Sequence, residues 1–452
     1  MHVADTIVAV ATAPGAGGVG IVRVSGTQAG AIARALLGRA PRARHAHYTA
    51  LREADGALLD QGLLLWFPAP HSYTGEDVLE LHAHGSPILL DLLLRRVCAL
   101  GARPARAGEF SERAYLNGKL DLAQAEAIAD LIAAGSEAAV RAAQRALAGV
   151  FSARVNELQA LLTGARVQIE AALDFPDEEL ELLADPALLG ALAELRVQVA
   201  AVLVEARRGV RLARGMSVVL VGRPNTGKSS LLNALAGEDR AIVTAVPGTT
   251  RDVLRLELQL DGVRLDLADT AGLRAARDAI EREGTRRALA ALTDADLALL
   301  VSDAEHWIDD LAAVRAYAPD MAVLVVLNKI DLLGQPAARI EDAASPLRIA
   351  LSARSGAGVD LLRAELRRRA SGGDTDTAYS ARTRHVLALQ RAAAEIEAAS
   401  FEVQRAAARQ GGLAELAAEA LRRAQQALDE LTGTHSSEDL LDAIFSNFCI
   451  GK

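Results

Sequence analysis

One segment constrains the fold more than any other: Gly222-Arg223-Pro224-Asn225-Thr226-Gly227-Lys228-Ser229-Ser230. It has the spacing G-x-x-x-x-G-K-[ST] of a phosphate-binding loop. The apolar run 217–221 before it predicts a buried strand, and the run 231–235 after it predicts a helix. The backbone N–H groups of such a loop, and the N-terminus of the helix, point at phosphate oxygens. The sequence therefore predicts an α/β nucleotide-binding domain built around this loop.

Two further segments suit the phosphates and a metal ion. In a loop of this kind the amine of Lys228 reaches the outer phosphates and the hydroxyl of Ser229 binds Mg²⁺. The segment Asp269-Thr270-Ala271-Gly272 ends the predicted strand 263–267. There a carboxylate can hold the magnesium shell, and a glycine N–H can reach the terminal phosphate. The segment Pro247-Gly248-Thr249-Thr250-Arg251-Asp252 offers a threonine hydroxyl to the same ion.

Two more segments select the base. Asn328-Lys329-Ile330-Asp331 follows the apolar run 322–327, and Ser352-Ala353-Arg354 follows the run 347–351. The carboxylate of Asp331 can accept both N–H donors of a guanine edge, whereas adenine would leave an unpaired group. Five motifs in this order predict a GTP site. Its predicted residues are Asn225, Thr226, Gly227, Lys228, Ser229, Ser230, Thr244, Ala245, Val246, Pro247, Gly248, Thr249, Thr250, Asp269, Thr270, Ala271, Gly272, Asn328, Lys329, Asp331, Ser352, Ala353 and Arg354.

The residue after Gly272 is Leu273, where many regulatory GTPases place a glutamine that orients the attacking water. Leucine cannot orient water, so another group must do so. Glu281 is a carboxylate a short loop away. A solvated helix charge is the alternative interpretation of Glu281, and the residues alone leave both open.

Length and composition bound the rest. A chain of 452 residues predicts about three domains. Its two cysteines give no disulfide framework, its start has no basic signal region, and no run is expected to reach a membrane-spanning length, which together favour a cytoplasmic protein. The net charge of −9 argues against a general nucleic-acid coat but leaves a local basic patch open.

Lysine is rare. Of the 49 basic residues only Lys119, Lys228, Lys329 and Lys452 are lysines. Lysine is expected to persist where its compact point charge is needed. Because two of the four lie in the nucleotide motifs, Lys119 and Lys452 become candidate ligand contacts, against the alternative of ordinary solvated side chains.

The chain in order predicts three kinds of structure. Residues 1 to about 118 predict an α/β region with strands near 7–11, 20–24, 63–66 and 78–82 and helices near 29–37 and 87–100. Glu80, His82 and His84 alternate on one strand face, which favours a polar pocket wall over a metal site. Residues 120–214 and 382–448 are helical in pattern. Since neither block has a core of its own, they predict one helical domain with the GTPase domain inserted at a loop tip.

Several further segments are distinctive: Asp5-Thr6-Ile7-Val8-Ala9, Arg23-Val24-Ser25-Gly26, Tyr73-Thr74-Gly75-Glu76-Asp77-Val78-Leu79-Glu80, Gly108-Glu109-Phe110, Leu116-Asn117-Gly118-Lys119, Leu173-Asp174-Phe175-Pro176 and Phe448-Cys449-Ile450-Gly451-Lys452. In these segments the chain resembles the tRNA modification GTPase MnmE (TrmE) family, nearly end to end. Ala245, Pro247 and Ser86 depart from the usual family residues.

The resemblance implies a domain plan and a fold class. It implies an α+β N-terminal domain (1–118) for tetrahydrofolate binding and dimerisation, followed by an all-α helical domain in two parts (119–213 and 377–452). An α/β P-loop GTPase domain (214–376) is inserted between those parts. It also implies a homodimer that works with the flavin-dependent partner MnmG to put a (carboxymethyl)aminomethyl group on carbon 5 of the wobble uridine of certain tRNAs.

The resemblance also implies which residues of this chain bind tetrahydrofolate, Mg²⁺ and potassium. Arg23, Glu80, Lys119 and Lys452 would line a site for 5-formyl- or 5,10-methylene-tetrahydrofolate. Ser229 and Thr250 would bind Mg²⁺, and potassium would take the place of an arginine finger, bound by Asn225, Thr244, Val246 and Thr249. Glu281 matches the water-orienting glutamate of the family.

Two other functions stay open. A ribosome-assembly or signalling GTPase would lack a folate site, so changes at Lys119 and Lys452 would have no effect. A stand-alone folate-dependent aminomethyltransferase regulated by GTP would transfer its one-carbon group to tRNA without a flavin-dependent partner. Cys449 is expected to pack rather than to act as a nucleophile, because no histidine neighbours it in the sequence.

Overall fold

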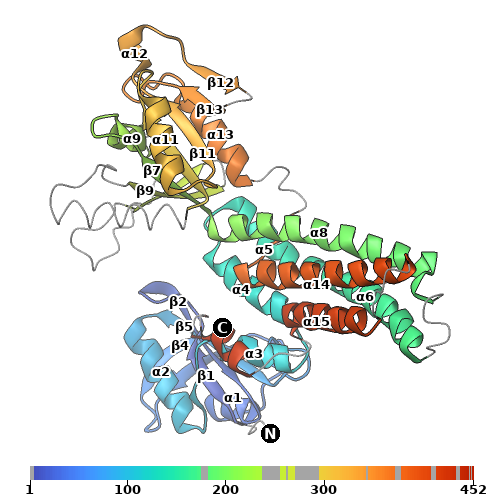
Figure 1. Ribbon diagram of the computed structural model, residues 1–452. Helices are drawn as coiled ribbons and strands as arrows, with labels where there is room; N and C mark the ends of the chain where they lie inside the picture. Colours follow the sequence, from blue (N-terminus) through green and yellow to red (C-terminus); the bar gives the residue numbers. More distant parts are fainter. Residues whose placement is uncertain are drawn as a thin grey trace, which may run out of the picture. The chain divides into compact units, whose positions relative to one another are not determined.

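The computed structural model describes residues 5–174, 182–236, 255–260, 263–269, 295–342, 345–371, 378–408, 414–433, 438–446, 448 and 450–451. It divides into two compact units (Figure 1). The first unit comprises Met1–Ala129, Leu147–Val199 and Ala388–Lys452, and the second comprises Asp130–Ala146 and Ala200–Leu387.

The first unit begins with a six-stranded sheet in the order β3-β4-β5-β2-β1-β6. Its strands are β1 (Ile7–Val10), β2 (Gly17–Ser25), β3 (His47–Arg52), β4 (Leu58–Phe67), β5 (Val78–Gly85) and β6 (Arg103–Pro104). All neighbours pair antiparallel except β1 and β6. Helices α1 (Ala29–Leu37) and α2 (Pro87–Ala99) bury their apolar sides on this sheet, with Ile32 and Leu93 almost fully covered. The glycine-rich segment 14–18 lies at the connection from β1 into β2.

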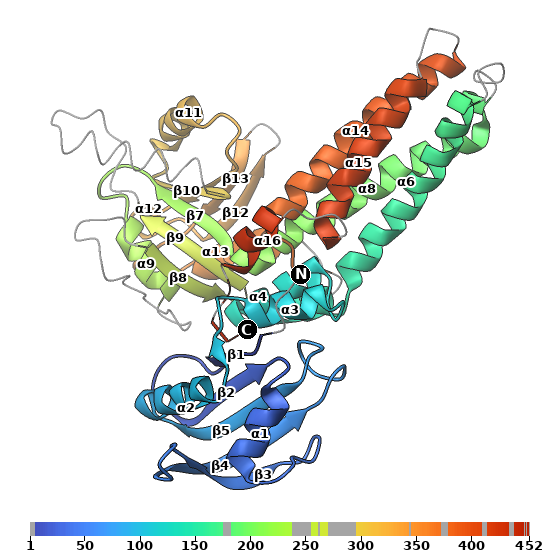
Figure 2. The same cartoon turned by 90° about the horizontal axis from the view of Figure 1, so that it is seen from below.

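The helices of the first unit come from both ends of the chain. They are α3 (Glu109–Leu116), α4 (Leu122–Ala133), α6 (Val150–Asp174), α15 (Ala414–Thr432) and α16 (Glu438–Phe445), together with most of α14 (Thr383–Ala407) and about half of α8 (Pro186–Arg214). Helix α6 lies beside α15 in both views (Figures 1 and 2). Gln159 Nε2 donates to Asp429 Oδ1 at 2.7 Å, and Arg166 donates to Gln425 Oε1 at 2.7 Å. Segments before and after the nucleotide motifs therefore pack on each other.

Helix α8 differs from the expectation that no run reaches a membrane-spanning length. It is 29 residues long, and its most apolar 18-residue window has a mean hydropathy of 1.8. By length and composition alone it could cross a membrane, as can the core helix of a soluble protein. Leu188, Leu192, Leu195, Val199 and Val202 recur at three- and four-residue spacing and are buried.

The second unit is built on a seven-stranded sheet in the order β12-β13-β11-β10-β7-β9-β8. Its strands are β7 (Met216–Val221), β8 (Arg255–Leu260), β9 (Val263–Asp269), β10 (Leu297–Ser302), β11 (Val323–Leu327), β12 (Ala338–Asp342) and β13 (Ser345–Ala350). The five inner strands run parallel, and the edge strands β8 and β12 pair antiparallel.

Helices cover both faces of this sheet, which explains why the inner strands β7, β10 and β11 are apolar without alternation. Helices α9 (Lys228–Ala236) and α13 (Val359–Ser371) pack with Val218 and Leu220, while α11 (Trp307–Tyr317) packs with Val219 and Val221. The unit also contains α12 (Ile330–Leu333) and most of α5 (Glu137–Leu147). Because the inner strands are parallel, their carboxyl ends meet at one edge of the sheet, where the predicted nucleotide motifs follow β7, β9, β11 and β13.

Candidate functional site

The phosphate loop joins β7 to α9, as its spacing predicts. Gly227 has φ +94°, and a Cβ added there would lie 2.3 Å from Nδ2 of Asn328, so only glycine fits. The ammonium of Lys228 donates to the carbonyl oxygens of Gly222 and Arg223, each at 2.9 Å. The loop thus curls around a cation that is 9% exposed. Such a curl suits the phosphates and Mg²⁺ of a bound nucleotide.

Asn328 connects three loops at this edge. Its Nδ2 donates to Thr226 O at 2.8 Å, and its Oδ1 accepts from the backbone N–H groups of Lys329 and Ala353, at 2.8 and 3.0 Å. The side chain is 4% exposed, so these bonds are sheltered from water. Lys329 Nζ donates to Asn225 O at 2.6 Å. Asn328 therefore fixes the phosphate loop against both base-selecting segments.

A pocket of about 270 Å³ opens between these loops, called the nucleotide pocket below. Eight of the residues predicted for GTP line it, from three separate segments. They are Gly227, Ser230, Asn328, Lys329, Asp331, Ser352, Ala353 and Arg354, and Leu332 is a further lining residue that the sequence analysis did not name.

Arg223 is held by groups that the sequence analysis also missed. Its Nε donates to Asp310 Oδ1 at 2.6 Å, and Ser302 Oγ donates to Asp310 Oδ2 at 2.5 Å. Asp310 lies in the first turn of α11 and is 8% exposed. It therefore fixes one side of the phosphate loop from the neighbouring strand and helix. An acidic residue early in a helix is too common a pattern to have revealed this role.

Several predicted residues fall outside the described part of the chain. They are Thr244, Ala245, Val246, Pro247, Gly248, Thr249, Thr250, Thr270, Ala271, Gly272, Glu281, Cys449 and Lys452. Asp269 ends strand β9, and its side chain is likewise outside the description. Ser229 is exposed in the first turn of α9.

A second constellation of predicted residues lies in the first unit. Arg23 of β2 stands opposite Glu80 of β5, and its Nε donates to Glu80 Oε1 at 2.9 Å. Both side chains are 16% exposed. His82 Nε2 lies 3.2 Å from the other carboxylate oxygen, Oε2. The Arg23 guanidinium also lies over the ring of Tyr73, 5.2 Å from its centroid, where a cation–π attraction adds to the ion pair.

Residues 450 and 451 reach this constellation from the far end of the sequence. Ile450 pairs with Ala107 in an antiparallel bridge, and Gly451 O accepts from Arg23 at 3.5 Å. Gly451 has φ +99°, and an added Cβ would lie 2.2 Å from Val10 O. The predicted Lys452 follows Gly451 in the sequence and lies outside the described residues. Lys119 is exposed and donates to Pro70 O at 3.2 Å.

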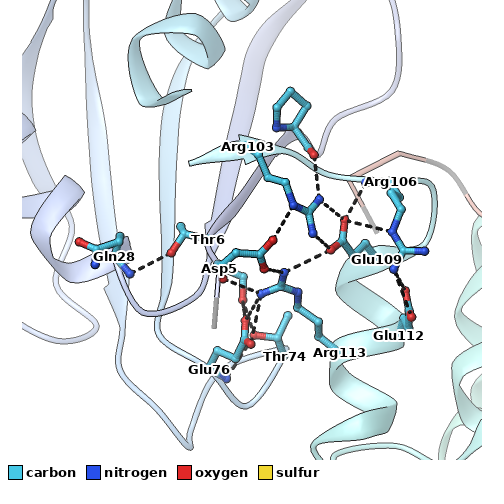
Figure 3. A network of polar contacts seen from close by, with 12 residues as sticks. Asp5, Thr6, Gln28, Thr74, Glu76, Arg103, Arg106, Glu109, Glu112 and Arg113 are labelled. Atoms are coloured by element: carbon cyan, nitrogen blue, oxygen red, sulfur yellow. Dashed lines mark hydrogen bonds and ion pairs between the residues drawn. The ribbon is translucent and has the colours of Figure 1, made fainter. Parts of the chain in front are cut away.

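Helix α3 joins this constellation to a network of charges (Figure 3). Its residue Phe110 has its ring centroid 5.9 Å from the Arg23 guanidinium, and its residue Ser111 lies 2.8 Å from the hydroxyl of Tyr73. Burial raises the pKa of Tyr73 more than its contacts with Ser111 and Arg23 lower it. The phenol therefore keeps its proton at neutral pH.

The network is centred on Glu109, the first residue of α3. Glu109 is 3% exposed and accepts from Arg103 at 2.5 and 2.9 Å and from Arg113 at 3.2 Å. Arg113 also donates to Asp5 and Glu76. Burial is the largest single influence on Glu109 and opposes its ionisation, but the hydrogen bonds from Arg103, from the N–H of Arg106 and from Arg113 together outweigh it and lower the pKa of Glu109. Five charges of alternating sign hold α3 in place (Figure 3).

The described residues include no group of three or more histidine, cysteine, aspartate or glutamate side chains suited to a metal ion. Glu80 and His82 face Arg23, whereas His84 is exposed and bonds Asp60 at 2.9 Å. Cys98 is half-buried, and burial raises the pKa of its thiol.

The parallel sheet, the lysine-bearing phosphate loop and the Asn-Lys-Ile-Asp segment define the second unit as a P-loop domain of the GTPase class. Two family models match the chain. The GTP-binding protein TrmE N-terminus matches residues 6–119, and the MnmE helical domain matches residues 122–449. The chain belongs to the tRNA modification GTPase MnmE family, as its resemblance implies.

Relatives of that description match over the whole chain. A tRNA modification GTPase MnmE of Methylococcus capsulatus is 53% identical and covers 99% of both chains. Those of Stutzerimonas stutzeri and Sodalis glossinidius are each 52% identical, covering 99% and 100% of both chains. Among solved structures, the G domain of the T. maritima FeoB iron transporter is 26% identical over 34% of this chain and 98% of its own, with a TM-score of 0.28.

Proposed function

We propose that the nucleotide pocket binds the guanine of GTP, and that the chain is the potassium-stimulated GTPase of a complex that modifies tRNA. That complex would add a (carboxymethyl)aminomethyl group to carbon 5 of the wobble uridine of certain tRNAs. The observation that carries the proposal is the pocket itself. Its eight predicted residues come from three segments that are separate in the sequence.

The residue roles in GTP binding follow from the donors and acceptors. Asp331 would accept the two N–H groups of guanine, while Ser352, Ala353 and Arg354 close behind the base. Lys228 would exchange its two carbonyl partners for the outer phosphates, a charge-assisted contact that is stronger than a neutral one. Ser229 and Thr250 would hold Mg²⁺, with Asp269 in its outer shell. Mg²⁺ supplies charge neutralisation between the phosphates.

Potassium would be held by Asn225, Thr244, Val246 and Thr249. Asn225 is exposed with φ +64°, and its side-chain amide makes no hydrogen bond among the described residues, so its oxygen is accessible. A monovalent cation there would neutralise charge that develops between the phosphates during hydrolysis. Glu281 would orient the attacking water, because the residue after Gly272 is a leucine.

The first unit would hold a 5-formyl- or 5,10-methylene-tetrahydrofolate at Arg23 and Glu80, with Lys119 and Lys452. The paired guanidinium and carboxylate beside Tyr73 and Phe110 offer the polar and aromatic contacts that a flat heteroaromatic ring requires. A lysine ammonium suits a carboxylate, such as that of a folate glutamyl tail. Tetrahydrofolate supplies the one-carbon unit when it is bound.

We also propose the domain plan and the partners. Residues 1–118 would form the folate-binding and dimerisation domain, 119–213 and 377–452 the helical domain, and 214–376 the inserted GTPase domain. The protein would act in the cytoplasm, away from membranes, as a homodimer with the flavin-dependent partner MnmG and tRNA.

The test measures GTP hydrolysis by the purified chain in potassium and in sodium buffer, with wild type, Asn225→Ala and Glu281→Ala compared. Strong stimulation by potassium is expected for wild type. It is expected to be lost in Asn225→Ala, because a ligand of the ion is gone, and hydrolysis is expected to fall by about 10²-fold or more in Glu281→Ala. Equal wild-type rates in the two salts would exclude potassium as the activating cation.

A further inference from the structure

A second pocket of about 350 Å³ lies in the second unit, away from the nucleotide pocket. Met216 and Leu297, the first residues of β7 and β10, form its floor. Its walls carry three arginines, Arg211 of α8 and Arg368 and Arg369 of α13, with one carboxylate, Asp296. We call it the arginine pocket. It lies at the amino ends of the parallel strands, whereas the phosphate loop follows the carboxyl end of β7.

Two carboxylates hold the walls of the arginine pocket in place. Glu365 is 3% exposed and accepts from Arg368 at 2.8 and 2.9 Å and from Arg369 at 2.7 Å. Asp296 accepts from the N–H of Ser217 at 2.9 Å and lies 3.4 Å from Arg214. Glu365 also lies 3.6 Å from Arg339. Of the charged residues that line the pocket, three are arginines and one is an aspartate, so the lining carries an excess of two positive charges.

Arg211 carries part of that excess without any partner in the described part of the chain. No hydrogen bond or ion pair of its guanidinium is found there, although the residue lines the pocket. Its neighbours on α8 continue the charge. Arg207, Arg211 and Arg214 are spaced by four and three residues, so they lie on one helix face, and all three are exposed. This row spans about 10 Å, longer than one phosphate group.

Helix ends favour these arginines but do not explain why they meet. A cation in the last turn of a helix interacts favourably with the helix dipole, which suits Arg211 and Arg214 of α8 and Arg368 and Arg369 of α13. That effect falls off within one turn, and it does not require cations from two helices to face one hollow. Guanidiniums offer forked donors that match phosphate oxygens, and they remain charged at every physiological pH.

We propose that the arginine pocket and the row Arg207-Arg211-Arg214 bind backbone phosphates of tRNA. The inference rests on the proposed function in tRNA modification. A polyanion fits better than one free phosphate, because the charge extends from the pocket along the helix. The chain as a whole is acidic, with a net charge of −9, so a contact with RNA needs such a local excess.

The arginine pocket and the phosphate loop lie at opposite ends of one strand. Strand β7 runs between the two pockets, from Met216 at the arginine pocket to Val221 before the phosphate loop. Six residues of extended chain separate the two sites by roughly 20 Å. An RNA phosphate at the arginine pocket therefore does not compete with GTP, and the two can be bound at once.

The test uses the full chain and an unmodified tRNA transcript carrying a fluorescent label. Binding is followed by anisotropy from 50 to 200 mM salt for wild type, Arg211→Gln and Arg211→Lys. Arg39→Gln is the matched control, because Arg39 is exposed in the first unit and makes no hydrogen bond or ion pair among the described residues.

Arg211→Gln is expected to bind tRNA about three- to tenfold more weakly than wild type. The slope of log affinity against log salt is expected to fall by about one, the signature of one lost phosphate contact. Arg211→Lys is expected to restore the slope, since it restores the charge. Arg39→Gln should match wild type, and GTP hydrolysis without tRNA should be unchanged in every variant.

Each other outcome overturns the proposal in its own way. Equal tRNA affinity and equal salt slope in Arg211→Gln and wild type would show that the arginine pocket does not bind tRNA, and would not affect the proposed function. If inorganic phosphate protects wild type but not Arg211→Gln from heat while tRNA binding is equal, the site takes a free anion instead. If wild type fails to bind the transcript, both alone and with its flavin-dependent partner, the proposed function fails as well.

Discussion

Gly227 leaves no room for a side chain, since an added Cβ would lie 2.3 Å from the amide nitrogen that ties Asn328 to Thr226. Gly227→Ala is expected to displace Asn328, separate the loops and weaken GTP binding by at least about 100-fold. Titration with a fluorescent GTP analogue measures the loss. Gly334→Ala is the control: Gly334 also has positive φ, +59°, but open space around it. Strain of about 1 kcal/mol with normal GTP binding is expected there.

Asp331 is exposed in the nucleotide pocket, where its carboxylate has only acceptors to offer. Asp331→Asn replaces one acceptor by a donor, which opposes the N–H groups of guanine and suits the carbonyl of xanthine. GTP affinity is expected to fall by about 10²-fold or more and XTP affinity to rise, measured by competition. Asp309→Asn, an exposed aspartate on α11, should change neither affinity. Unchanged preference for GTP in Asp331→Asn would place the base elsewhere.

Single residues also show how far the sequence could lead. The positions of Lys228, Asn328 and Asp331 after strands of the sheet could be predicted, because their motifs have fixed spacing after a strand. Asp310 was not, because its bond to Arg223 joins residues 87 apart and no local pattern distinguishes it from any helix-starting acid. Tyr73 and Phe110 were likewise missed as partners of Arg23, since aromatic rings at a distance leave no spacing to recognise.

Among the elements, α3 depends on its first residue. Glu109 is buried between Arg103 and Arg113, so Glu109→Gln would leave two guanidiniums short of a charged partner. A loss of about 1–3 kcal/mol in the local stability of α3 is expected. Hydrogen exchange of residues 109–116 in the full chain measures it as a fall in protection. Glu112→Gln on the same helix removes only contacts to the exposed Arg106 and should cost less than about 1 kcal/mol.

The same helix should respond to acid. The folded-state pKa of Glu109 lies below its ordinary value of 4.5, so its stabilisation is fully present above pH 4.5. It is lost as pH falls through the lower, folded-state pKa. Protection of α3 in wild type should therefore decline below pH 4.5, and the difference from Glu109→Gln should shrink there. A difference that persisted unchanged into strong acid would show that the charge of Glu109 is not what anchors α3.

At this scale the sequence predicts helices better than edge strands. The spacing of apolar residues located α1 and α2 to within one residue. The edge strands β3, β6, β8 and β12 were missed, and so was the inner strand β10. Strand β3 alternates weakly, and β6 has only two residues. The length of α8 also escaped notice, because arginines in its second half interrupt the apolar run without interrupting the helix.

On the scale of the molecule, the Arg23 site contains residues from near both ends of the sequence. Gly451→Ala is expected to displace the segment, because its Cβ would lie 2.2 Å from Val10 O, and to weaken tetrahydrofolate binding by about tenfold or more. Calorimetric titration with 5-formyl-tetrahydrofolate measures it. Gly101→Ala, at φ +108° in open space, is the control and should bind normally. Equal affinities would mean that residues 450–452 contribute nothing to the ligand.

Two helical patterns that each lacked a core led to the prediction that the nucleotide domain is inserted between them, and α6 packs on α15. What the patterns could not predict was a second cluster of charge at the amino ends of the strands. Its arginines come from α8, which precedes the strands of the sheet in the sequence, and from α13, which follows them. Taken alone, each of these helices has the pattern of a helix whose solvated end carries basic residues.

The contact between Arg23 and Gly451, 428 positions apart, has a consequence for the growing chain. A ribosome adding about 5 to 20 residues per second needs roughly 20 to 90 seconds between the two. During that time α6 has been synthesised but its packing partner α15 has not. The described strands of the nucleotide domain follow one another in the sequence, so all of them have been synthesised by then. The GTPase is thus complete before the Arg23 site. A nascent chain that stopped between these two points would contain the complete nucleotide domain but not residues 450 and 451 of the Arg23 site.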